Sequence, residues 1–224
     1  MKRAISGVIG AAFLLAWQGL PAAAADYLVK APVESWTGRW YWEARIGAPL
    51  PQSYDVTIAG IGAGTYRPDT GIHFAAAIGK EFSRNWRAEL EINWTQANDG
   101  VAFGLPHAGK VSVFGLLGSV LYSFDLGGAA VRPFVGAGVG LAYYRTRNLG
   151  AIGGAFVLND SDLTLGAALH AGLDIPITPA AALTARYSLY ALGDASFAST
   201  PPGFTTTKAA NIDHVFTIGF RLYR

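Results

Sequence analysis

Eight segments of the chain alternate apolar residues with small or polar ones at a period of two, which is the pattern of strands and not of helices. The clearest segment is 86–95, where Trp86, Leu90 and Trp94 fall on one face and Arg87 and Glu91 fall on the other. The predicted strands cover residues 39–47, 71–80, 86–95, 111–124, 131–145, 162–174, 181–190 and 214–224.

The connections between these segments alternate in length: the first, third, fifth and seventh are long, and the others are short. In chain order they cover residues 49–70, 81–85, 96–110, 125–130, 146–161, 175–180 and 191–213. Transmembrane β-barrels place short turns on one side of the outer membrane and longer loops on the other. The pattern therefore predicts an all-β protein, an eight-stranded antiparallel transmembrane up-and-down β-barrel with four long extracellular loops.

Residues 1–25 predict a secretory signal peptide, which would be removed on export. Lys2 and Arg3 give a basic start, an apolar run follows, and Ala23–Ala25 forms a small-residue cleavage site. The apolar run is shorter than the ~20 residues that a membrane-spanning helix needs. We assign 26–38 to a periplasmic N-terminal lead-in and 39–224 to the barrel, located in the cell outer membrane.

The composition excludes several classes of protein. The formal charge is only +2, and Lys2 and Arg3 of the leader supply this excess. A nucleic-acid-binding chain would be markedly basic, so we expect no nucleic-acid partner. The absence of cysteine excludes disulfides and thiolate metal sites. Hydrophobic residues make up 51 % of the chain and glycine is abundant, which suits strands with one face in lipid and one in a crowded lumen.

The charged residues of the predicted strands fall on the inward face. An eight-stranded barrel is just wide enough to be filled by its own side chains, and buried charges must be paired. We therefore predict a structural network of lumen charges, in which Glu89 would pair with Arg87 or Arg45. Its members are Glu43, Arg45, Arg87, Glu89, Glu91, Asp174, Arg186 and Arg221.

Aromatic residues on the outward face are predicted to lie at the two membrane interfaces, where Trp and Tyr concentrate. They are Trp40, Trp42, Trp86, Trp94, Tyr122 and Tyr187.

Several short motifs resemble a known family. The opening segment 25–38, the run Pro133–Gly140 and the closing segment 216–224 look like those of the small alphaproteobacterial outer-membrane β-barrel family, which comprises OmpA-like and porin-like surface proteins. The resemblance implies insertion by the barrel-assembly machinery. That machinery usually reads a terminal Phe, where this chain has Arg224. Some relatives bind hemin at their loops, which makes His107, near Phe103, a speculative haem contact.

No catalytic or metal site is predicted, and no cofactor is expected. The four histidines are far apart in the sequence, without the spacing of a metal site. The H-x-S-N type motif of the lipid A deacylase class is absent around His73 and His170.

The predicted function is a structural or surface-interaction role, through contact of the long loops with an unknown surface ligand. Outer-membrane lipid and lipopolysaccharide are the expected partners, and the protein is expected to be a monomer. A small porin-like channel, a hemin-binding surface protein and, last, a lipid A-modifying hydrolase are the alternatives.

Overall fold

The computed structural model describes residues 36–126, 131–151, 157–200 and 204–224. The predicted signal peptide and most of the predicted lead-in lie outside this part of the chain. Its thirteen strands form one sheet with antiparallel pairing throughout. Their bounds are β1 Trp40–Pro49, β2 Tyr54–Ile58, β3 Gly62–Pro68, β4 Ile72–Glu81, β5 Trp86–Ala102, β6 Leu105–Ser123, β7 Arg132–Ala151, β8 Val157–Leu158, β9 Ser161–Thr178, β10 Ala181–Leu192, β11 Ala195–Thr200, β12 Thr205–Lys208 and β13 Asn211–Tyr223. Within the described ranges, no helix is long and apolar enough to cross a membrane.

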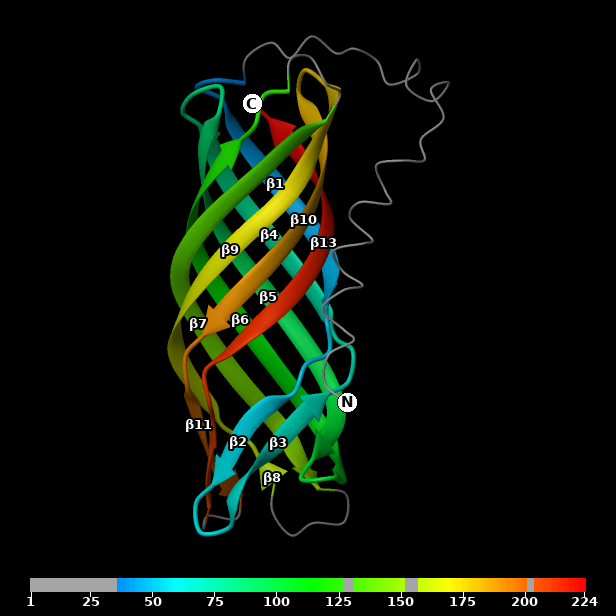
Figure 1. Cartoon of the computed structure of the whole chain (residues 1–224), viewed down its shortest axis with the longest axis vertical. Coiled ribbons are helices and arrows are strands. Elements are labelled where there is room, and N and C mark those ends of the chain that lie inside the picture. The colour runs from blue at the N-terminus through cyan, green and yellow to red at the C-terminus, as the bar shows by residue number, and fades with distance from the viewer. Residues whose placement is uncertain (1–35, 127–130, 152–156, 201–203) are drawn as a thin grey trace.

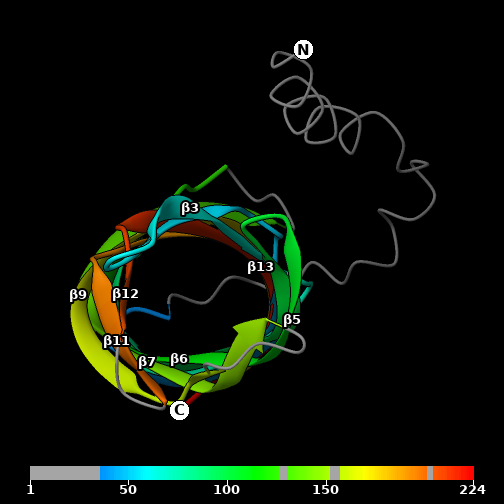
Figure 2. The same cartoon turned by 90° about the horizontal axis from the view of Figure 1, so that it is seen from below.

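One set of strands closes into a ring, which we call the base ring. β1 pairs with β4 on one side and with β13 on the other, from Tyr41 opposite Tyr223 to Pro49 opposite Val215. The remaining pairings run through β5, β6, β7, β9 and β10 and return to β13. The strands therefore surround a central axis, as the view along the molecule shows (Figure 2). Closure leaves the base ring without a free sheet edge.

A second ring continues the wall at the end opposite the C-terminus (Figure 1). β5, β6 and β7 run on past the base ring, and the pairings β7–β8, β8–β11, β11–β12, β12–β2, β2–β3 and β3–β5 complete the circuit. We call this the extension ring. The lumen is consequently walled by paired strands over a greater length than the base ring alone provides.

Two glycines mark the junction of the rings, where the strands form bulges. The pairing of β5 with β6 shifts register between Asn98 and Gly100, and that of β6 with β7 shifts between Ala108 and Lys110. Gly100 has a φ of 151°, and Gly109 has a φ of 134°. A Cβ at either position would lie within 2.6 Å of a backbone oxygen on the neighbouring strand. Glycine permits both the backbone conformation and the close approach that re-aims the wall.

The all-β, antiparallel part of the sequence prediction is confirmed, but the simple eight-strand, long-loop description needs correction. The predicted loop 49–70 contains β2 and β3, 146–161 contains β8, and 191–213 contains β11 and β12. The predicted loop 96–110 consists of the ends of β5 and β6, joined at Phe103 and Gly104, which both have positive φ. Such a two-residue turn matches the twist of a hairpin. These strands are short and poor in regular apolar alternation, so their partners across the ring decide their structure.

The base-ring strands have one apolar and one largely polar face, as the period of two predicts. On the outer face, Val139 is 71 % exposed and Leu165 is 74 % exposed, while alternate residues such as Arg87 and Glu91 are fully buried in the lumen. An outer surface of this kind exceeds the apolar patches that soluble monomers tolerate.

Small residues on the lumen face make room for large neighbours. Gly79 on β4 lies beside the Tyr41 ring of β1, and a Cβ on Gly79 would lie 2.2 Å from that ring. Gly118 lies on the outer face of β6. A Cβ on Gly118 would have one neighbouring atom within 4 Å, the Val139 carbonyl oxygen at 4.0 Å.

We expect Gly79→Ala to destabilise the folded barrel by about 1–3 kcal/mol, because the added methyl group overpacks the lumen. The measurement is the temperature at which the folded band of the refolded protein converts to the unfolded band in a heat-modified gel shift. Gly118→Ala is the matched control and should leave that temperature unchanged. Equal temperatures for the two variants would contradict the packing derived for Gly79.

Candidate functional site

The lumen of the base ring holds a compact group of paired charges, which we call the charge belt. Its members come from β1, β5, β9, β10 and β13, and each is at most 4 % exposed. They are Glu43, Arg45, Arg87, Glu89, Glu91, Asp174, Arg186 and Arg221. The four arginines thus face four carboxylates, a balance that a water-poor interior requires.

The contacts of the charge belt bridge strands that are distant in the sequence. Asp174 accepts from Arg87 at 2.7 Å and from Arg221 at 2.9 Å. Arg221 also donates through Nε to Glu43 at 2.7 Å, and Arg45 contacts both Glu43 and Glu91. The belt is therefore a connected network across the lumen.

Glu89 lies at the centre of this network, where it pairs with Arg87, as the sequence predicted, and more closely with Arg186, which the sequence did not predict. Arg186 Nη1 lies 2.9 Å from a Glu89 oxygen, and the Tyr41 hydroxyl donates to Glu89 at 2.8 Å. Arg87 lies at 3.7 Å, whereas Arg45 pairs with Glu43 and Glu91. Arg186 is on β10, remote from β5 in the chain, so only the closed ring brings them together.

Three aromatic residues and one alanine form a hydrophobic cluster over the belt at the end with the short turns, which we call the aromatic plug. Its members are Trp36, Tyr41, Ala182 and Tyr223. The Trp36 ring stacks on Tyr223 with centroids 4.3 Å apart, and its Nε1 donates to the Pro179 carbonyl at 3.0 Å. The Arg132 guanidinium lies 5.1 Å from the Trp36 ring centroid. Trp36, which belongs to the predicted lead-in, is thus packed inside this end of the base ring, a role the sequence did not indicate.

Histidine and hydroxyl groups form the other boundary of the charge belt. His170 lies between Ser119 and Ser188, with ring nitrogens 3.2 Å and 2.9 Å from their hydroxyl oxygens. His73 Nδ1 lies 2.7 Å from Thr95 Oγ1. The Tyr190 hydroxyl donates to Glu91 at 3.0 Å. This layer separates the belt from the rest of the lumen.

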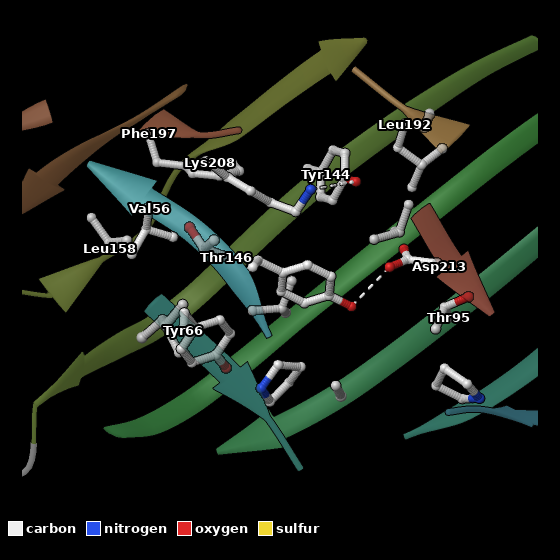
Figure 3. Close-up of a pocket in the computed structure, with 18 of the residues that line it drawn as sticks. Val56, Tyr66, Thr95, Tyr144, Thr146, Leu158, Leu192, Phe197, Lys208 and Asp213 are labelled. Atoms are coloured by element: carbon white, nitrogen blue, oxygen red, sulfur yellow. Dashed lines mark hydrogen bonds between the residues drawn. The ribbon is translucent and has the colours of Figure 1, made fainter. Parts of the chain in front are cut away.

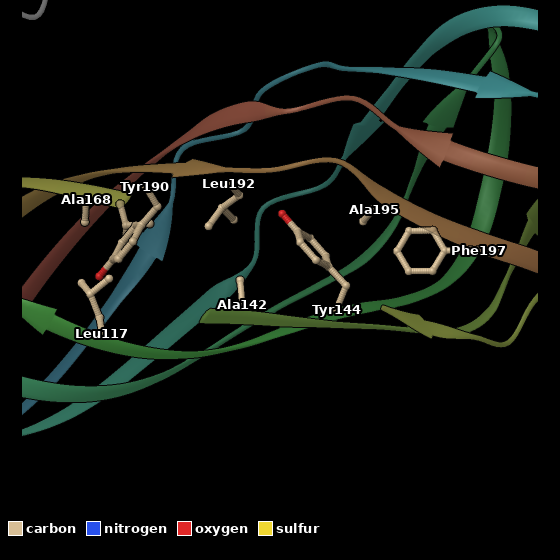
Figure 4. Packing of buried hydrophobic residues seen from close by; sticks show 9 residues of the cluster. Leu117, Ala142, Tyr144, Ala168, Tyr190, Leu192, Ala195 and Phe197 are labelled. Atoms are coloured by element: carbon tan, nitrogen blue, oxygen red, sulfur yellow. The ribbon is translucent and has the colours of Figure 1, made fainter. Parts of the chain in front are cut away.

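Beyond this layer the lumen contains an apolar cavity of about 320 Å³, which we call the chamber. It extends from the part of the base ring next to the extension ring into the extension ring itself, and Figure 3 shows strands of both around it. Much of its lining comes from two clusters of buried hydrophobic residues, one of which includes Leu117, Tyr144, Tyr190 and Phe197 (Figure 4). Its size is in the lower range of small-molecule sites, which are likewise mostly apolar with a few polar groups.

Comparison with known proteins identifies the architecture. The family model described as outer membrane protein beta-barrel domain matches residues 12–222. The chain belongs to this family. Its location is therefore the cell outer membrane, whereas the alphaproteobacterial origin implied by the motifs stays a prediction.

Two solved structures are similar in fold. The outer membrane protein OprG from Pseudomonas aeruginosa has a TM-score of 0.61 and 14 % sequence identity, covering 84 % of this chain and 96 % of that chain. The outer membrane protein AlkL in DMPC lipid bilayers has a TM-score of 0.52 and 17 % identity, covering 84 % of this chain and 90 % of that one. No curated protein matches the chain.

On the outer wall, aromatic side chains gather on neighbouring strands, and their place at the membrane interfaces stays a prediction. Trp94 stacks on Phe74 and neighbours Phe114, which neighbours Tyr143, so four adjacent strands present an aromatic row. Trp86 packs edge-on against Tyr122 at 5.0 Å towards the short-turn end. Of the other predicted interface residues, Trp40 and Trp42 are exposed, and the Tyr187 hydroxyl contacts His214.

The speculative haem residue His107 lies on β6, in the extension ring, and not in an irregular loop. Its Nδ1 is 2.9 Å from the Leu105 carbonyl oxygen. Both His107 and Phe103 contribute to the lining of the chamber. Hemin coordination stays a prediction, and in the described part of the chain no three His, Asp or Glu side chains are grouped to hold a metal ion.

We expect Glu89→Leu to destabilise the barrel by about 3–5 kcal/mol, because it leaves the buried Arg186 without a main partner. The same gel-shift temperature measures the effect. Adding Arg186→Met should recover part of the loss, since the unpaired charge is then removed.

Asp125→Asn is the control for this experiment, because Asp125 pairs with the exposed Arg84 at the surface. Such pairs contribute about 0–1 kcal/mol, so the shift temperature should hardly change. An unchanged temperature for Glu89→Leu would remove Glu89 from the network.

Proposed function

We propose that this protein is a non-catalytic surface receptor of the outer membrane, which binds small apolar molecules in the chamber. The observation that supports it most strongly is the apolar cavity that the extension ring surrounds. It lies next to a base-ring lumen that holds the buried side chains of the charge belt. The surface ligand that the sequence left unidentified would then be a small apolar molecule, and it would bind in the chamber.

We infer further that the eight strands of the base ring are the transmembrane barrel and that the extension ring projects outside the cell. The apolar outer face of the base ring supports this, because lipid-exposed backbone must be fully paired and its side chains apolar. The connections opposite the extension ring are short, as periplasmic turns are in this class. Lipopolysaccharide and lipid would then contact the outer wall of a monomeric barrel.

The filled lumen argues against the alternative of an open pore. The charge belt, the aromatic plug and the Phe134 ring lie inside the base ring, and these side chains are buried. Arg87 lies 4.5 Å from the Phe134 ring centroid, and Arg221 lies 4.7 Å from that of Tyr41. Water and ions would have to displace paired, buried charges to pass.

We expect no discrete current steps when the refolded wild-type chain is inserted in a planar bilayer. A paired truncation, Glu89→Ala with Arg186→Ala, removes bulk without changing the net charge and should increase the frequency of current events. Stable unitary conductance of the wild-type protein would support a channel instead.

Binding to the chamber is tested by a matched pair of substitutions on the two faces of the wall. Val113 lines the chamber, whereas Val139 faces outward. Val113→Phe should weaken binding of the apolar fluorophore N-phenyl-1-naphthylamine about tenfold, a loss of about 1.4 kcal/mol of apolar burial. Val139→Phe should leave binding unchanged.

The titration is made on protein in nanodiscs, with empty nanodiscs as the background. Equal affinities for the wild type and Val113→Phe would show that the fluorophore does not enter the chamber. That result would contradict the proposed function.

A further inference from the structure

The wall of the chamber contains one lysine ammonium, from Lys208 at the end of β12. Figure 3 shows the side chain directed towards Tyr144. Lys208 Nζ lies 3.3 Å from the Tyr144 hydroxyl and 3.4 Å from the Ala209 carbonyl oxygen, and it also contacts the Asn211 side-chain oxygen. All three acceptors are neutral, and no carboxylate in the described ranges joins them.

Two aromatic rings flank the same ammonium. The Tyr54 and Tyr144 ring centroids each lie 5.0 Å from Nζ, within the range of cation–π attraction. The rings hold the ammonium at the wall of the chamber, where Lys208 is half-buried. They stabilise a positive charge without neutralising it.

Two carboxylates, Asp69 and Asp213, also line the chamber, and Asp194 is a further acidic residue near Lys208. In the described structure none of the three forms an ion pair with Lys208. Asp213 is bound instead by the Tyr54 hydroxyl, which donates to it at 2.8 Å, and by the Asn211 amide. Asp194 accepts from the Ala210 amide at 2.6 Å. Burial lowers the pKa of Lys208 to about 8, despite the opposing attraction of Asp213 and Asp194. A counter-ion inside the chamber would therefore be stabilised by the ammonium.

Elsewhere in the lining, one buried polar atom has no partner in the described structure. His73 contributes to the chamber, is 1 % exposed, and has a buried Nε2 with no hydrogen-bond partner. An apolar molecule that carries one additional polar atom could satisfy it, whereas a pure hydrocarbon could not.

Resting on the proposed function, we propose that the chamber selects monocarboxylic acids with an apolar body, whose carboxylate would replace the Ala209 carbonyl oxygen, the longest of the three contacts, as an acceptor of Lys208. A monocarboxylate brings one negative charge to the single ammonium, whereas a phosphate dianion would bring two into a lining that already holds Asp213. The aromatic flanks and the apolar lining would take the rest of the molecule.

Equilibrium dialysis of radiolabelled octanoate and octan-1-ol against the mature chain in nanodiscs tests this, with empty nanodiscs correcting for uptake by lipid. The wild type should bind octanoate about tenfold more tightly than octanol, the factor expected for one charged hydrogen bond. Lys208→Met should remove the preference by weakening octanoate alone, and Lys208→Arg should retain it. Lys110→Met, a change on the exposed side of β6, should leave both affinities unchanged.

The pH dependence provides an independent signature. Octanoate binding should be constant near neutral pH and fall as the pH rises above about 8, because the ammonium is lost. Tyr54, Tyr144, Asp213 and Asp194 are the other titratable groups around it. Octanol binding, and octanoate binding to Lys208→Met, should not follow this fall.

The outcomes separate the two proposals. If neither octanol nor the apolar fluorophore binds, the proposed function fails together with the inference. If both bind but octanoate is not preferred, or if its preference survives Lys208→Met, the carboxylate proposal alone is overturned. Retained octanol binding and an unchanged gel-shift temperature exclude misfolding of the variant.

Discussion

The pairing of β1 with β13 is the constraint on which the remaining structure depends. In hydrocarbon an unpaired backbone amide or carbonyl costs several kcal/mol, so a spanning sheet must close. The register from Tyr41–Tyr223 to Pro49–Val215 joins the first base-ring strand to the last and removes both edges. Closure also fixes the direction in which every side chain of the base ring points.

Closure fixes the interior volume as well, and this volume limits the size of the side chains that can point into the lumen. A ring of this size has room for large side chains only where opposite or adjacent positions are small. Gly79 beside Tyr41 and Gly172 beside Phe134 are examples of such pairs of small and large residues. The charges that enter this space must be paired, and the belt around Glu89 and Arg186 meets that requirement.

In the extension ring, the segments between the base-ring strands are paired strands and not free loops. Free loops would offer only a variable surface, whereas paired strands enclose a volume. Because the charge belt and the aromatic plug occupy the base-ring lumen towards the short turns, that volume is a chamber with one filled end. The same arrangement places Lys208 against an apolar interior, although in sequence it belongs to a polar stretch of threonines. The enclosure, and not the residue type, gives this lysine its proposed role.

The period-two strands, the apolar outer face and the inward position of charges such as Arg87 and Glu91 could be predicted from the sequence, because strand geometry alternates side chains regardless of partners. Which charges meet could not be predicted from it. Glu89 contacts Arg186 through ring closure, and the two residues are 97 positions apart. Nor did the sequence reveal β2, β3, β8, β11 and β12, whose short, weakly alternating segments are held by pairing with one another. The chamber, and the enclosure of His73 and Lys208 in it, were decided by the tertiary structure alone, because a cavity exists only where distant strands close around it.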